Sequence, residues 1–352
     1  MNQTTQAQKT PRAIASVLLT GQQPSRVQRK GRYTPESMAH PAKMLPAIAA
    51  QVIAAYTDPG DLVVDPMCGI GTTLVEAVHQ GRHAAGMEYE AHFAQMAAGN
   101  LRHARSQGAI GTGQIVKGDA RNIATALAER TGDAALVLTS PPYGATTHGQ
   151  VRAGRDNGGG KVDKFDNRYS TDRRNLAHRP TAELVAGFGQ ILTGSATLLR
   201  PGGVVAVTVR PFRVAGELID LPGQVISIAE ENGLVLIDRF AALLCGIRGG
   251  QIVTRASFFQ MVEARRLQQK GIPALATAHE DLLVFQARSE ATRAPATVQC
   301  GAGELDGGSP NRRSPSRPAC LTGLDLAQRG RAGSTGRFRS GSAAGMGGAV
   351  TW

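Results

Sequence analysis

Features of a membrane, secreted or metal-binding protein are scarce in this sequence of 352 residues. It has no run of about 18 uncharged apolar residues and no apolar signal-peptide core near its start, so we expect a cytoplasmic protein without a membrane partner. Its four cysteines lack CxxC spacing, which predicts neither a zinc site nor a disulfide framework. Aromatic residues make up only 4% and glycines number 43, so part of the chain is expected to stay unpacked.

The formal net charge of +12 lies mainly in polar segments near both ends and in the segment 144–180. Basic side chains of this kind suit contact with a nucleic-acid backbone, although an Arg-rich genome would explain the charge near the C-terminus equally well. We predict a basic, mostly flexible segment over 1–33, in which the apolar run 14–19 can dock. A folded domain is predicted over 34–288, and a disordered Gly/Ser/Arg-rich tail over 289–352.

Strand-like and helix-like stretches alternate within the predicted domain. Short apolar runs predict strands at 62–64, 83–87, 114–116, 134–138, 204–209, 234–244 and 282–285. Apolar residues at helical spacing predict helices at 41–56, 72–80, 91–106, 121–130, 182–199 and 224–232. This alternation predicts an α/β fold with a doubly wound, mostly parallel sheet, in which ligands bind at the carboxyl ends of the strands.

The segment Asp65-Pro66-Met67-Cys68-Gly69-Ile70-Gly71-Thr72-Thr73 follows the first strand and opens a helix. Its glycines let the backbone approach a ligand closely, and the helix N-terminus offers free N–H groups. Glu88 ends the next strand, where a carboxylate either accepts both hydroxyls of a ribose or stays solvated. Asp119 follows the third strand and is placed to accept from an adenine amino group, to cap the next helix, or to do both.

A second motif, Thr139-Ser140-Pro141-Pro142-Tyr143-Gly144, follows the fourth strand. The two prolines fix the backbone and remove N–H donors, so this site is rich in hydrogen-bond acceptors. An exocyclic amine of a nucleobase is a poor nucleophile because its lone pair is delocalised into the ring. Hydrogen bonds from the amine to the Ser140 hydroxyl and the Pro141 carbonyl would favour a pyramidal nitrogen, and Tyr143 would stack on the base.

Both motifs resemble motifs I and IV of the amino-methyltransferases, which use S-adenosylmethionine to methylate cytosine N4 or adenine N6 in DNA. Ser-Pro-Pro-Tyr is the form most associated with the cytosine-N4 members. Residues 34–46 are similar to the family's motif X, which flanks the methionine end of the cofactor, and the resemblance covers residues 34–287. It implies a Rossmann-like class I methyltransferase fold with a seven-stranded sheet whose last strand is antiparallel.

The resemblance also implies the site residues, S-adenosyl-L-methionine as the cofactor, and no metal. The implied cofactor-binding residues are Lys43, Asp65, Pro66, Met67, Gly69, Gly71, Thr72, Thr73, Glu88 and Asp119. The implied catalytic residues are Ser140, Pro141, Pro142 and Tyr143. We expect direct methyl transfer to the amine of a flipped-out base in DNA, first cytosine N4 and next adenine N6. A cognate restriction endonuclease is a possible partner.

Alternatives to this interpretation stay open. RNA guanine-N2 methyltransferases share the fold and a Pro-Pro-Tyr motif, but they usually have Asp or Asn in the position of Ser140 and an RNA-binding domain upstream. Methylation of a protein glutamine and a non-catalytic nucleic-acid-binding relative are further alternatives. The basic segment 144–180 is expected to be mobile and to contact DNA. The segment 246–280 is equally well read as a DNA-facing helix or as an ordinary amphipathic one.

Overall fold

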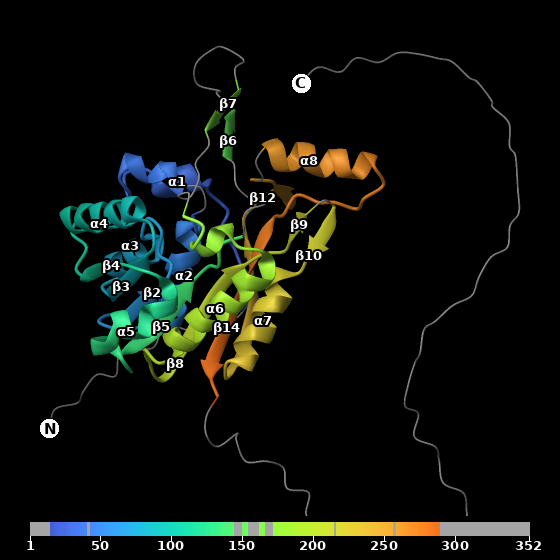
Figure 1. Ribbon diagram of the computed structural model, residues 1–352. Coiled ribbons are helices and arrows are strands. Elements are labelled where there is room, and N and C mark those ends of the chain that lie inside the picture. Colours follow the sequence, from blue (N-terminus) through green and yellow to red (C-terminus); the bar gives the residue numbers. More distant parts are fainter. Residues whose placement is uncertain are drawn as a thin grey trace, which may run out of the picture. The chain divides into compact units, whose positions relative to one another are not determined.

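The structure is a computed structural model that describes residues 15–40, 43–143, 150–153, 162–165, 172–214, 216–255 and 258–288. These residues belong to one compact unit, which ends at Pro295. At its centre is an eight-stranded sheet with the order β1-β11-β14-β8-β5-β2-β3-β4 (Figure 1). The strands are β1 (Val17–Leu18), β2 (Leu62–Asp65), β3 (His83–Glu88), β4 (Gly113–Lys117), β5 (Ala134–Thr139), β8 (Leu199–Val209), β11 (Leu234–Leu243) and β14 (His279–Ala287).

The pairing of the strands confirms the predicted fold class. Strand β2 is parallel to β3 and β5, β3 is parallel to β4, and β5 is parallel to β8, whereas β14 is antiparallel to both β8 and β11. The chain runs outward from β2 to β4 on one side and outward from β5 to β8 on the other. The winding direction therefore reverses between β2 and β5, which is where open α/β sheets bind their ligands.

Helices cover both faces of the sheet (Figure 1). On one face lie α2 (Pro46–Tyr56), α3 (Thr72–His79) and α4 (Ala91–Ser106), and on the other α5 (Ile123–Ala126), α6 (Thr181–Ala196) and α7 (Leu221–Glu231). Helix α2 begins later than predicted, at Pro46, because a proline suits the first helical turn and disfavours helical backbone before it. The predicted helix 121–130 is instead split into η2 (Ala120–Asn122), α5 and η3 (Ala128–Arg130).

The prediction of a mostly flexible N-terminal segment is wrong for residues 15–33. Strand β1 pairs in parallel with β11, so the apolar run does dock and adds an eighth strand to the seven predicted. Helix α1 (Ser25–Arg29) follows, and the side chains of Arg29 and Tyr33 are buried. The Tyr33 hydroxyl donates to Glu76 of α3 at 2.7 Å. Charged and polar side chains thus anchor this segment on the domain, while residues 1–14 lie outside the described part.

Several small elements gather at the end of the sheet where the parallel strands finish (Figure 1). They are the hairpins β6 (Gln150–Ala153) with β7 (Val162–Phe165), β9 (Phe212–Val214) with β10 (Glu217–Ile219), and β12 (Gly246–Arg248) with β13 (Gln251–Val253), the helix α8 (Phe258–Gln269), and the short helices η1 (Pro35–Ala39) and η5 (Leu176–His178). The rest of segment 144–171 and the predicted tail lie outside the described residues. No helix among the described residues is both long and apolar enough to cross a membrane.

Candidate active site

A cavity of about 1370 Å³ opens at the carboxyl ends of the parallel strands. Pockets for a single small ligand usually measure about 300–1,000 Å³, so this one has room for a cofactor and part of a second molecule. All the predicted site residues except Gly71 line it, namely Lys43, Asp65, Pro66, Met67, Gly69, Thr72, Thr73, Glu88, Asp119, Ser140, Pro141, Pro142 and Tyr143.

The strand order sets where each of these residues lies along the cavity. Asp119 follows β4, Glu88 ends β3 and Asp65 ends β2, which places three carboxylates on one side of the switch point. Ser140 follows β5, on the other side. Neighbouring strands are about 4.8 Å apart, so the acidic positions and the Ser-Pro-Pro-Tyr segment succeed one another along a single edge of the sheet.

The loop between β2 and α3 needs glycine at two positions for different reasons. Gly69 has a φ of +54°, and a Cβ there would lie 3.0 Å from Nε2 of the buried His40. Gly71 has a φ of +80°, and its Cβ would lie 3.2 Å from Cβ of Ala97 in α4. Gly69 therefore allows a left-handed turn packed against His40, whereas Gly71 serves the turn and the packing of α4.

Glu88 is fixed by two hydrogen bonds and keeps further acceptor sites for a ligand. Its two carboxylate oxygens accept from the backbone N–H groups of Gly69 and Glu90, each at 2.8 Å. Burial raises the pKa of Glu88 to about 7, against the lowering effect of these two hydrogen bonds. A carboxylate oxygen has two acceptor sites, so one on each oxygen is left for a pair of ligand hydroxyls. Free acceptor sites on both oxygens of a buried carboxylate suit two neighbouring hydroxyls of a ligand.

Asp65 organises the loop from within. Its Oδ2 accepts from the Thr73 hydroxyl at 2.7 Å and its Oδ1 from the Met67 N–H at 3.1 Å. Burial raises the pKa of Asp65 to about 6. The Thr72 hydroxyl in turn accepts from the Arg29 guanidinium at 3.2 Å. The polar side chains of this loop are therefore engaged in holding its shape, and its backbone faces the cavity.

Asp119 caps η2 by accepting from the Arg121 N–H at 3.0 Å. The Arg121 guanidinium also donates to it, with Nε 2.9 Å from Oδ1. These hydrogen bonds lower the pKa of Asp119. The capping role expected from the sequence is thus confirmed, and the carboxylate stays ionised at the cavity wall, where it remains an acceptor.

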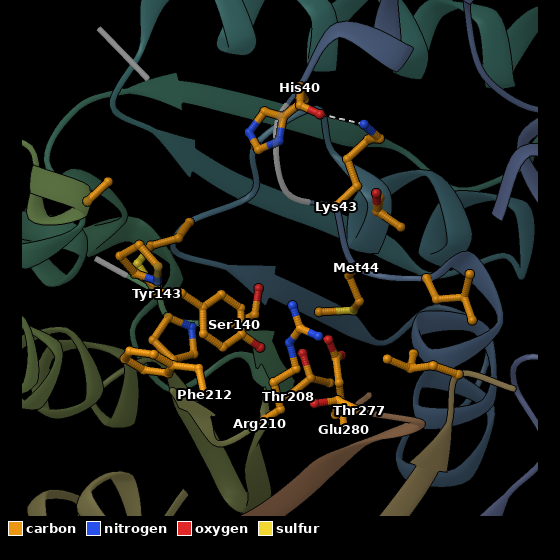
Figure 2. Close-up of a pocket in the computed structure, with 18 of the residues that line it drawn as sticks. His40, Lys43, Met44, Ser140, Tyr143, Thr208, Arg210, Phe212, Thr277 and Glu280 are labelled. Atoms are coloured by element: carbon orange, nitrogen blue, oxygen red, sulfur yellow. Dashed lines mark hydrogen bonds between the residues drawn. The ribbon is translucent and has the colours of Figure 1, made fainter. Parts of the chain in front are cut away.

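The Ser-Pro-Pro-Tyr segment forms the opposite half of the cavity (Figure 2). Phe212 stands edge-on to Tyr143, with ring centroids 6.2 Å apart and an interplanar angle of 86°. Burial raises the pKa of the Tyr143 hydroxyl well above its usual range, and the charge of Glu280 adds to this while Arg210 opposes it. Tyr143 is therefore a neutral aromatic side chain in the cavity lining, of a kind that can stack on a planar ligand.

The cavity lining also contains residues that were not predicted as site residues, among them Thr208, Arg210, Phe212 and Glu280. A usable signal existed, because Arg210 and Phe212 closely follow β8, just as the predicted residues follow their strands. Asn100 had no such signal. From the middle of α4 it donates to the Ile70 carbonyl at 2.8 Å and accepts from the Ser37 hydroxyl at 2.8 Å, which ties residues 34–39 to the β2–α3 loop.

Comparison with known proteins finds sequence similarity to DNA methylases. The DNA methylase family model N6_N4_Mtase matches residues 2–99. The chain is also 36% identical over 70 residues to the type II methyltransferase M.ScaI of Streptomyces caespitosus, which is 20% of this chain and 23% of that protein. These matches confirm the resemblance to amino-methyltransferases of the N4/N6 type, and the family match begins well before residue 34. The chain spans about a quarter of that curated relative.

Solved structures with a similar fold include two from Thermus thermophilus and Thermotoga maritima. TrmN from Thermus thermophilus gives a TM-score of 0.42 at 15% identity, covering 74% of this chain and 53% of that one. A SAM-dependent O-methyltransferase from Thermotoga maritima gives a TM-score of 0.42 at 13% identity, covering 72% of this chain and 69% of that one.

Proposed function

We propose that this protein methylates an exocyclic amino group of a flipped-out base in DNA, first cytosine N4 and next adenine N6. The observation that carries the proposal is the position of Ser140 and Pro141. They lie in the same cavity as Glu88 and Asp119, one strand beyond the switch point, and directly before the aromatic face of Tyr143. The hydrogen-bond acceptors for an amine, the aromatic side chain for a base and the residues assigned to the cofactor therefore line one cavity.

The cofactor half is assigned to Glu88, for the two ribose hydroxyls, and to Asp119, for the adenine amine. Lys43 and the backbone of the β2–α3 loop complete it at the methionine end. S-adenosylmethionine supplies a methyl group on an electrophilic sulfonium. The chain's own contribution is to orient the amine: Ser140 and Pro141 accept its hydrogens, which turns the nitrogen lone pair toward the cofactor half.

DNA as the substrate is supported by the basic side chains in the cavity lining. Four arginines line the cavity in addition to Arg210, namely Arg26, Arg174, Arg213 and Arg255. They come from four separate segments of the chain rather than from one face of a helix. Such side chains suit the phosphates that flank a base drawn into the cavity. A restriction endonuclease that shares the recognition site is the partner we propose, and the cytoplasm is the proposed location.

The test is the Ser140→Ala variant, measured in a single turnover on duplex DNA with labelled cofactor. The loss of one positioned acceptor should slow methyl transfer about 100- to 1000-fold, with little change in the affinity for DNA or cofactor. Ser106→Ala, on the exposed part of α4, is the matched control and should transfer at the parent rate. Mass spectrometry of the digested DNA identifies the product. Unchanged transfer by Ser140→Ala would contradict the assignment of Ser140.

A further inference from the structure

The half of the cavity beyond Ser140 contains a cation that the two motifs leave without a role. Arg210 directly follows β8, and the antiparallel register that pairs Val209 with Asp281 sets it opposite Glu280 at the start of β14. Figure 2 shows Arg210 and Glu280 beside Ser140 and Tyr143. A guanidinium and a carboxyl thus form the wall next to the place assigned to the base.

Arg210 is held against the aromatic platform with a donor still unused. Its guanidinium carbon lies 5.3 Å from the centroid of the Tyr143 ring. Its Nε is buried and has no hydrogen-bond partner among the described residues. Buried N–H groups in folded proteins are nearly always paired, so an unpaired one at a cavity wall suits an acceptor brought by a ligand.

Glu280 compensates the charge of Arg210 without occupying its donors. The two side chains form no ion pair in the described part of the chain. Glu280 nevertheless responds to the cation: burial raises the pKa of Glu280, and the charge of Arg210 opposes the rise. The carboxyl therefore acts on Arg210 through space and leaves the buried Nε–H of Arg210 without a partner among the described residues.

The bases differ in what lies next to the amine that would be methylated. Beside its N4 amine, cytosine presents the acceptors N3 and O2 in succession. Beside its N6 amine, adenine presents the acceptor N1 and then a C–H group. A guanidinium is a planar fork of N–H donors that binds two neighbouring acceptors at once. The edge of cytosine satisfies such a fork, whereas the edge of adenine leaves one donor unpaired.

We propose that Arg210 is a specificity-determining residue that binds the N3 and O2 edge of a flipped-out cytosine, with Glu280 as its positioning partner. This inference rests on the proposed function, because the base enters the cavity only if its amine is presented to Ser140. The fork of donors on Arg210, which lies outside both motifs, would favour cytosine over adenine.

The experiment compares random-sequence duplex DNA that contains cytosine with the same DNA made with 2-thiocytosine, whose sulfur is a weak acceptor. In single turnovers the parent should methylate the thio-DNA about 10- to 100-fold more slowly. The Arg210→Met variant should methylate ordinary DNA more slowly than the parent by a similar factor. It should methylate the ordinary DNA and the thio-DNA at the same rate. The Glu280→Gln variant should show a smaller difference between the rates on ordinary DNA and on thio-DNA. Arg105→Met is an exposed control on α4 and should show the same two rates as the parent.

Affinity for S-adenosylmethionine and the melting temperature show whether Arg210→Met is still folded. If Arg210→Met is unfolded, Arg210→Lys replaces it, because lysine keeps the cation but lacks the planar fork. Its ratio of the rate on ordinary DNA to the rate on thio-DNA should be smaller than that of the parent. The inference would be overturned if a folded Arg210 variant had the same ratio of rates on ordinary DNA and thio-DNA as the parent. N6-methyladenine as the main product would also overturn it, while DNA amino-methylation would stand. DNA left unmethylated by the parent would instead overturn the proposed function.

Discussion

At the scale of the single residue, Glu88 is under two opposing demands. Its burial raises its pKa to about 7, so ionisation of this carboxyl works against folding at neutral pH. The ribose hydroxyls assigned to it need the ionised form as their acceptor. The same group should therefore make stability and cofactor binding respond to pH in opposite directions.

Cofactor affinity should rise with pH through the range around 7. Between pH 6 and pH 8 the ionised fraction of Glu88 grows from about one tenth to about nine tenths, so affinity should increase about 10-fold. Calorimetric titration with S-adenosylmethionine measures this. Glu88→Ala is the control: it should bind about 5- to 150-fold more weakly at pH 8 and lack this part of the pH dependence. If the affinity of Glu88→Ala for the cofactor rose equally steeply with pH, the pH dependence would belong to another group.

The stability of the cofactor-free protein should change with the opposite sign. A carboxyl whose pKa is raised on folding contributes stability that is fully present below its unfolded pKa, and this contribution is lost as the pH rises through the folded value. Glu88 and Asp65 both behave in this way, with pKa values of about 7 and about 6. The melting temperature should therefore fall between pH 5 and pH 8, and less steeply in Glu88→Ala.

At the scale of the element, the anchor between the N-terminal segment and α3 depends on Glu76. This buried carboxylate accepts from Tyr33 at 2.7 Å and from Arg32 at 2.6 Å. Glu76→Ala leaves the buried tyrosine hydroxyl unpaired, so the free energy of unfolding should fall by about 2–3 kcal/mol. Urea denaturation measures the loss. The matched control is Glu183→Ala, which removes an exposed ion pair with Arg179 and should change stability by under about 1 kcal/mol.

The same anchor shows what the sequence can and cannot predict. Apolar periodicity placed α4 at its observed bounds and found each of the seven main strands, because these patterns are local. Residues 20–33 are mostly polar and show no such pattern. Their packing depends on Glu76, which lies 43 residues after Tyr33 and reads in the sequence as an ordinary helical glutamate. Partners so distant in the chain leave no local signal.

At the scale of the whole molecule, the site follows from the topology. Residues that end or follow β4, β3, β2, β5 and β8 must lie in that order along one edge, whatever their separation in sequence. Recognising the motifs after β2 and β5 was therefore enough to locate the two halves of the cavity. The residues that follow β8 had no recognised motif, and only the assembled sheet sets Arg210 opposite Glu280 of β14 at this edge.

The compact unit that ends at Pro295 should suffice for folding and for cofactor binding. A chain of residues 1–295 should therefore keep the melting temperature of the full chain to within about 1 °C, since all the described elements lie within it. Its affinity for S-adenosylmethionine, measured by calorimetry, should be unchanged. Methyl transfer to short duplexes should continue at the parent rate, with at most weaker DNA binding at low salt.

A second truncation, of residues 1–33 from the same chain, should have a large effect. It removes β1 from the sheet edge, takes both donors from the buried Glu76 carboxylate, and deprives Thr72 at the start of α3 of its Arg29 partner. The melting temperature should fall by about 10 °C or more, because several kcal/mol are lost and each kcal/mol shifts it by about 2–4 °C. Equal melting temperatures for the two truncated chains would show that the N-terminal anchor does not stabilise the domain.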